Sequence, residues 1–92
     1  MNETEFRKLL TDEGYEGPFE YDRRPDFVDE QHVHDFDVLA MVVEGSLTIE
    51  KPSGDQTCHA GETVGFPAGE PHVEKPGSDG VKAFVGRRTP AQ

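Results

Sequence analysis

The chain has 92 residues and a mass of 10.2 kDa, which is enough for one domain with one hydrophobic core. Nine Lys and Arg residues against 19 Asp and Glu residues give a formal net charge of −10. This excess of acid argues against binding to nucleic acid or to an anionic membrane surface. No apolar run approaches the ~20 residues of a transmembrane helix, and the single cysteine, Cys58, excludes an intrachain disulfide. We expect a small, acidic, cytoplasmic protein.

The charge divides the chain unevenly. Residues 1–37 carry a net charge of −8, whereas residues 38–92 carry a net charge of −2. We therefore expect an N-terminal helix and acidic lead-in over residues 1–17, a compact β-barrel over residues 18–88 and a short tail over residues 89–92.

One amphipathic helix is predicted near residues 3–12. Asn2 and Glu5 have the spacing of a capping box. Gly14 can take the left-handed conformation that ends a helix. One face of the helix carries a narrow apolar stripe that we expect to pack on a larger body: Phe6, Leu9 and Leu10.

Beyond Gly17 the sequence changes to short β segments separated by Gly- and Pro-containing turns. The loops are too short for helical crossovers, so we expect antiparallel pairing in an all-β barrel or sandwich of seven or eight strands. A turn at Glu44-Gly45 predicts a hairpin over residues 38–50, and residues 76–80 predict a further turn. The expected strands cover residues 19–23, 27–34, 38–43, 47–49, 56–59, 63–66, 72–75 and 81–85.

The segment 38–43, with sequence VLAMVV, is apolar on both faces. A strand of this kind must be covered on both sides. One face can line the barrel, and the other can meet the N-terminal segment, a second sheet or a second subunit. We expect a homodimer.

Two features place histidines where they could hold a metal. His32 and His34 are two residues apart, so in a strand they project from one face with their Cα atoms about 6.5–7 Å apart, close enough to share a cation. The alternative is a pair of solvated histidines. His72 follows a stiff corner made by Pro67, Gly69 and Pro71, which suits a ligand as well as it suits a plain turn.

These residues resemble the two motifs of the cupin superfamily. The first is a Gly, five residues, then H-x-H-x(3,4)-E-x(6)-G, and it is matched by His32, His34 and Gly45. The second is G-x(5)-P-x-G-x(2)-H-x(3)-N, and it is matched by Gly61, Pro67, Gly69 and His72. The resemblance spans roughly residues 30–76. It implies a small antiparallel jelly-roll barrel and a divalent transition metal (Fe, Zn, Ni, Mn or Cu) held by His32, His34 and His72.

The chain departs from the family pattern at three positions. The first-motif glycine is absent, the glutamate position holds Val38, and the closing asparagine position holds Pro76. Asp37 lies beside the vacant glutamate position, but a regular strand turns it away from His34 unless a β-bulge intervenes. Glu74 shares the face of His72 and is either an acid/base group or an exposed edge carboxylate. Whether Asp37 or Glu74 joins the site is left open.

Other polar residues receive simpler interpretations. His59 is expected on the surface and Cys58 in the interior as a small apolar residue. A group before the His motif is expected either at the barrel mouth or, preferably, in a packed strand pair: Tyr21, Arg23 and Arg24. Arg87 and Arg88 are expected to end the last strand in solvent.

Three functions remain open. Three neutral imidazoles would leave the 2+ charge of a bound metal uncompensated, which favours a small anionic ligand or substrate. The chain is therefore expected to be a metal-binding cupin, either a metal-dependent enzyme of the dioxygenase or isomerase type or a non-catalytic ligand-binding, metal-binding or sensor module. A degenerate structural barrel is the third reading. Whether the protein turns over a substrate is not decided by the sequence.

Overall fold

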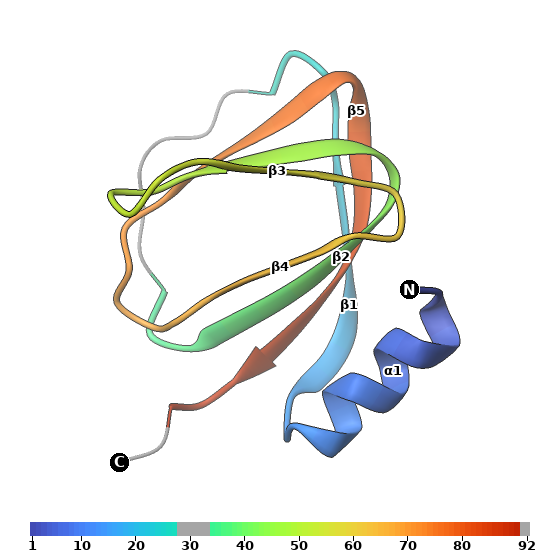
Figure 1. The fold of residues 1–92 in the computed structure, drawn as a ribbon, viewed down its shortest axis with the longest axis vertical. Coiled ribbons are helices and arrows are strands. Elements are labelled where there is room, and N and C mark those ends of the chain that lie inside the picture. The colour runs from blue at the N-terminus through green and yellow to red at the C-terminus, as the bar shows by residue number, and fades with distance from the viewer. Residues whose placement is uncertain (28–33, 91–92) are drawn as a thin grey trace.

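The computed structural model describes residues 1–27 and 34–90 (Figure 1). One helix precedes five antiparallel strands in a sheet of order β1-β5-β2-β3, with β4 paired to β2. The predicted antiparallel β-barrel with one N-terminal helix is thus confirmed. The elements are α1 (Glu3–Asp12), β1 (Glu16–Arg23), β2 (Asp37–Glu50), β3 (Gln56–His59), β4 (Thr63–Phe66) and β5 (Val73–Arg88).

Two long strands, β2 and β5, replace the shorter strands expected in their place. The predicted hairpin turn at Glu44-Gly45 is wrong, because β2 continues through it and pairs with β5 on both sides. The turn-forming residues produce an irregularity instead, with the register slipping on either side of Gly45, whose φ is +76°. A Cβ at Gly45 would collide with the carbonyl oxygen of Gly80, so glycine permits the close passage of the two strands.

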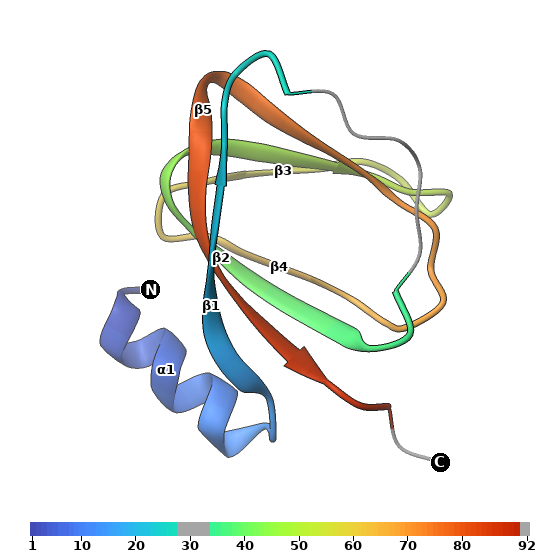
Figure 2. The same cartoon turned by 180° about the vertical axis from the view of Figure 1, so that it is seen from behind.

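The predicted turn over residues 76–80 is likewise part of a continuous strand, β5. Because β2 and β5 pair with each other on both sides of these residues, the two strands bend there, although the local sequence predicts turns that reverse the chain. As a result β2 pairs with β4 before the bend and with β3 after it, and the sheet curves around its inner face, as the views from the two sides show (Figures 1 and 2). The buried core on that face comprises Val38, Ala40, Val42, Leu47, Ile49, Cys58, Val64, Phe66 and Val81.

The predicted strands 56–59 and 63–66 are confirmed as β3 and β4. The predicted strand 27–34 lies mostly outside the described residues. Phe27 and His34, at its two ends, belong to no strand.

The helix α1 forms as its sequence predicts. The Asn2 side chain accepts a hydrogen bond from the Glu5 amide at 2.8 Å, and the Glu5 carboxylate accepts one from the Asn2 amide at 3.0 Å. Gly14, with φ of +79°, follows the C-cap residue Glu13. Both halves of the capping box and the left-handed glycine are therefore confirmed.

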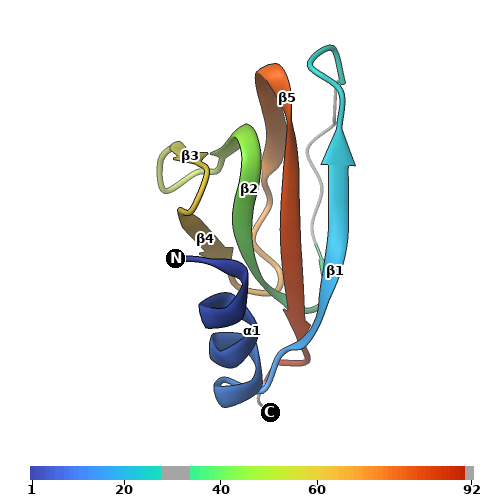
Figure 3. The same ribbon diagram turned by 90° about the vertical axis from the view of Figure 1, so that its right-hand side faces the viewer.

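The apolar stripe of α1 packs on the outer face of the sheet (Figure 3). Phe6 and Leu10 are fully buried and contact Met41 of β2, with partly buried residues around them: Tyr15, Leu39 and Phe84. The N-terminal segment thus covers the face of β2 on which the homodimer was expected. Dimerisation stays a prediction, but the apolar outer face of β2 no longer supports it, because α1 covers that face. Within the described part of the chain, no helix has the length and apolar character needed to span a membrane.

Arg88 ties the helix to the sheet and does not simply end β5 in solvent as expected. Its guanidinium donates to the Asp37 carboxylate at 3.3 Å and to the Glu13 carbonyl oxygen at 2.8 Å. It also lies 4.4 Å from the centre of the Tyr15 ring. The side chain therefore holds the C-terminal end of α1 against the start of β2.

Candidate metal and ligand site

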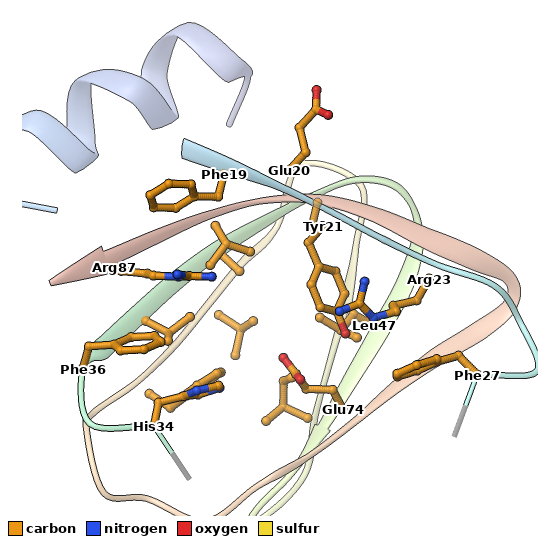
Figure 4. Close-up of a pocket in the computed structure, with 17 residues that line it drawn as sticks. Phe19, Glu20, Tyr21, Arg23, Phe27, His34, Phe36, Leu47, Glu74 and Arg87 are labelled. Carbon is orange, nitrogen blue, oxygen red and sulfur yellow. The ribbon is translucent and has the colours of Figure 1, made fainter. Parts of the chain in front are cut away.

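The curved inner face of the sheet encloses a cavity of about 430 Å³ (Figure 4). Aliphatic side chains from the barrel core form part of its wall, among them Ala40, Leu47, Ile49, Val64 and Val85. The remaining wall is aromatic or charged: Phe19, Glu20, Tyr21, Arg23, Phe27, His34, Phe36, Phe66, Glu74 and Arg87. A concave, mostly apolar cavity with a few polar groups is typical of a small-molecule site.

Two of the three histidines proposed as metal ligands lie next to each other: His34 lines this cavity, and His72 is buried behind it, outside the lining. The ring centres of His34 and His72 are 5.0 Å apart, and their planes are tilted by 39°. His34 also stacks on Phe36 at 4.8 Å, while His72 lies 4.1 Å from the ring of Phe66. His72 is 1% exposed. The third histidine, His32, lies outside the described residues.

The stiff corner of the second motif holds the first motif in place. The Gly69 amide, in a residue with φ of +82°, donates to the His34 carbonyl oxygen at 2.8 Å. The neighbouring Ala68 amide donates to the Asp37 carboxylate at 2.9 Å. The corner therefore sets His72 at the start of β5 and also fixes the backbone that carries His34.

A hydrogen bond fixes the state of the His72 ring. Its Nδ1 atom lies 3.1 Å from the carbonyl oxygen of Glu70. A carbonyl oxygen only accepts hydrogen bonds, so Nδ1 carries a proton, and in the neutral form of the ring the lone pair is then on Nε2. This tautomer, oriented by a backbone carbonyl, is the one in which metal-ligating histidines are commonly held.

The separation of the two rings fits shared coordination. Two imidazoles bound to one cation through bonds of about 2.0–2.1 Å, at an angle of roughly 90–110°, have ring centres roughly 4.5–5.2 Å apart. The observed 5.0 Å falls within that range. Among residues 1–27 and 34–90 no group of three or more His, Cys, Asp or Glu side chains is placed to hold a metal ion. Of the three histidines expected as ligands, the described residues contain two, His34 and His72.

Comparison with known proteins finds neither a matching family model nor a matching curated protein. Solved structures do match. A cupin-2 domain protein from Shewanella frigidimarina superposes with a TM-score of 0.65 at 20% identity, over 96% of this chain and 93% of the other. The chain has the cupin fold.

Two further similar structures belong to longer proteins. The polyketide cyclase RemF from Streptomyces resistomycificus matches at 25% identity with a TM-score of 0.62, over 75% of this chain and 50% of that one. The Fe(II) form of HppE in complex with substrate matches at 16% identity with a TM-score of 0.61, over 75% and 43%. This chain thus spans half or less of the length of both proteins.

The glutamate position of the cupin motif carries no charge in this barrel. Val38 occupies it and belongs to the buried core. The carboxylate of the adjacent Asp37 accepts hydrogen bonds from the Ala68 amide and the Arg88 guanidinium. No bulge between Asp37 and Val42 interrupts the register with β5.

Glu74 lines the cavity and is not the exposed edge carboxylate that seemed the simpler interpretation (Figure 4). Tyr21 and Arg23 also line the cavity, whereas Arg24 is exposed. The preferred reading of Tyr21 and Arg23 as members of a packed strand pair alone is therefore wrong. Strand alternation carries the signal, because residues 19, 21 and 23 of β1 share one face.

Arg87 is a cavity residue that sequence reasoning placed in solvent. It is exposed, but its guanidinium lies 4.8 Å from the ring centre of Phe19 and 5.1 Å from that of Phe36 (Figure 4). Cation–π contacts on both sides hold it at the cavity wall. Its one-residue offset from Arg88 places these two arginines on opposite faces of β5.

His59 and Cys58 behave as expected. His59 is exposed, and Cys58 is buried in the barrel core, outside the cavity wall. Burial raises the pKa of the Cys58 thiol, the nearby Glu62 carboxylate adds to the rise, and a hydrogen bond from Gln56 opposes it. A buried thiol with a raised pKa is a poor nucleophile.

Proposed function

We propose that this small cupin binds one divalent first-row transition metal through His32, His34 and His72 and takes a small anionic molecule in the adjoining cavity. The observation that carries the proposal is the approach of the His34 and His72 rings to 5.0 Å beside a cavity of about 430 Å³. The orientation of His72 by the Glu70 carbonyl supports it. The similar Fe(II) form of HppE holds a substrate.

The charge of the site favours an anion. Neutral imidazoles do not offset the 2+ charge of a metal, and the glutamate that would do so is replaced by the buried Val38. When bound, such a metal supplies Lewis-acid polarisation of a ligand oxygen or activates dioxygen. The aliphatic part of the cavity wall lowers the local dielectric constant, which strengthens electrostatic interactions within the cavity.

In an enzymatic form of the site, Glu74 is the acid/base group. Its carboxylate projects into the cavity that also receives His34 (Figure 4). It can therefore accept or return a proton on a molecule bound there. Proton transfer of this kind suits the isomerase type of reaction, whereas the dioxygenase type depends on the metal.

A non-catalytic binding or sensor module is the second candidate. It is favoured by the replacement of the usual carboxylate ligand with Val38 and by the engagement of Asp37 with Arg88. Both features weaken metal binding without closing the cavity.

Elemental analysis of the purified protein tests the proposal. We expect about one first-row metal per chain, as for a single His-rich site, and loss of most of it in His34→Ala and His72→Ala variants that retain their circular dichroism spectra. His59→Ala is the matched control, because His59 is exposed and lies outside the cavity wall. Metal retained by His72→Ala, or no metal bound after incubation with Fe²⁺, Zn²⁺, Ni²⁺, Mn²⁺ and Cu²⁺, would contradict it.

Turnover requires a separate assay. The metal-loaded protein is incubated with small carboxylates, and oxygen uptake and product isomers are measured. Activity that Glu74→Gln abolishes, with metal content unchanged, would support an enzyme. Absence of both reactions would favour the binding module.

A further inference from the structure

Arg23 lines the cavity and has a buried guanidinium nitrogen without a hydrogen-bond partner among the described residues. Arg23 Nη1 donates to the Asp22 carbonyl oxygen at 2.9 Å, but its Nε atom is buried and has no hydrogen-bond partner among the described residues. No carboxylate in the described part of the chain forms an ion pair with Arg23. A buried guanidinium donor that lacks an acceptor is costly, because it has lost its water.

The position of Arg23 is nevertheless fixed. Its guanidinium lies 4.2 Å from the ring centre of Tyr21 and 5.0 Å from that of Phe27, so aromatic rings hold it at the cavity wall (Figure 4). With Nη1 committed to the backbone, the edge formed by Nε and Nη2 is left for a ligand. That edge matches a planar carboxylate, which accepts two parallel hydrogen bonds from a guanidinium.

The rest of the cavity defines the body of the ligand. The aliphatic wall and the rings of Phe19 and Phe36 favour an apolar group, and a flat one suits the aromatic sides. The Glu74 carboxylate lies in the same cavity and repels a second negative charge (Figure 4). The complementary molecule is therefore a monocarboxylate with an apolar, preferably aryl, body.

We infer that Arg23 is the carboxylate-binding residue of this cavity and that its ligands are apolar monocarboxylates. The inference deepens the proposed function, on which it rests for the existence of a ligand site, because it names the class of small anion. The contact with Arg23 itself needs no metal, so it can be measured separately.

The test is calorimetric titration of chelator-treated, metal-free protein with benzoate, trans-cinnamate and hexanoate. Acetate and cinnamamide are the comparison ligands. We expect trans-cinnamate to bind at least about ten-fold more tightly than its neutral amide or acetate, and Arg23→Gln to lose at least about ten-fold in affinity. Arg24→Gln is the matched control, because Arg24 is the adjacent arginine but is exposed, and its affinity should be unchanged.

Three results would overturn the inference. The first is an unchanged carboxylate affinity in Arg23→Gln, and the second is equal binding of cinnamate and cinnamamide. The third is no binding of any of the three carboxylates at about 10 mM, because a dissociation constant above that concentration does not indicate a specific site.

A second variant separates ligand binding from a structural role. Arg23→Met keeps an apolar stem against Tyr21 and Phe27 but removes the buried donor, so we expect a melting temperature equal to or a few degrees above that of the parent protein. A drop of several degrees would assign Arg23 to structure and contradict the inference. Metal content should be unchanged in both Arg23 variants. If the protein takes up no metal but still binds carboxylates through Arg23, only the proposed metal site is overturned. If it takes up metal but its carboxylate affinity does not depend on Arg23, only this inference is overturned.

Discussion

Arg87 and Arg88 are neighbours in β5 but serve opposite faces of the sheet. Arg88 is engaged by Asp37, Glu13 and the Tyr15 ring on the side that α1 covers. Among the described residues, the Arg87 side chain has no hydrogen bond or ion pair and contacts two aromatic rings at the wall of a cavity large enough for a ligand. The difference separates two uses of one strand end: on the outer face Arg88 joins α1 to the sheet, and on the inner face Arg87 lies at the cavity wall.

The packing of the two faces agrees with this division. On the outer face Phe6 and Leu10 are fully buried, and Leu10 lies so close to Gly86 that no Cβ would fit between them. On the inner face Phe19 is 41% exposed at the cavity rim. Substitutions in the contact between α1 and the sheet should therefore reduce stability, and substitutions of exposed side chains at the cavity rim should reduce binding more than stability.

The largest expected effect is that of Phe6→Ala. Removing a fully buried ring from the contact between α1 and β2 should lower the free energy of unfolding by about 3–5 kcal/mol, measured by urea denaturation. Phe19→Ala at the cavity rim is the matched control and should cost about 1 kcal/mol or less. Equal losses in the two variants would break the proposed division.

Gly86→Ala tests the closeness of the helix to the sheet. The added methyl group meets the Leu10 side chain and should cost about 1–3 kcal/mol. Combining it with Leu10→Ala, which makes room for the methyl group, should cost less than the sum of the two single changes in a double-mutant cycle. Strict additivity would show that the clash is relieved elsewhere.

The two neighbouring arginines give the most direct comparison. Arg88→Ala leaves Asp37 without its cation and Glu13 without a donor, so we expect a loss of about 1–2 kcal/mol, reduced by the partial exposure of the pair. Arg87→Ala should change the free energy of unfolding by about 0.5–1 kcal/mol. A larger loss for Arg87 than for Arg88 in chemical denaturation would reverse the assignment of the two faces.

The smallest expected effect on stability is that of the Cys58 thiol, which lies in the buried core of the inner face, outside the cavity lining. Because burial raises the pKa of the folded thiol, its contribution to stability is complete below the unfolded pKa of about 8.5 and declines as the pH rises above that value. Cys58→Ala should remove this decline while lowering stability at neutral pH. Parallel stability curves of the two proteins between about pH 8 and 10 would show that the thiol does not titrate differently on folding.

Local signals predicted well the parts of the fold that local interactions determine. The capping box of Asn2 and Glu5 and the stripe of Phe6 and Leu10 act within one helix, so their spacing is sufficient evidence. The corner before His72 is similarly local, but the hydrogen bond from its Gly69 amide to the His34 carbonyl oxygen was not predicted. The site expectation for His32 stays a prediction, because that residue lies outside the described ranges.

Features that depend on long-range pairing were predicted wrongly. Glu44-Gly45 has the composition of a hairpin turn, yet pairing with β5 converts it into a bend within β2. Arg23 and Arg87 line the cavity because their side chains point to the inner face once the sheet has curved and closed. Neither residue carries a local signal that distinguishes a cavity wall from solvent, and register alone decides it.

The central position of β5 has a consequence for how the chain reaches its native state. This strand pairs with both β1 and β2, and Asp37 lies opposite Arg88, so residues separated by half the chain must find each other before the barrel exists. Closing such distant pairs carries a large entropic barrier, which predicts folding on the millisecond-to-second timescale. During synthesis, β1 and the edge of β2 that pairs with β5 would stay unpaired until residues 73–88 emerge from the ribosome.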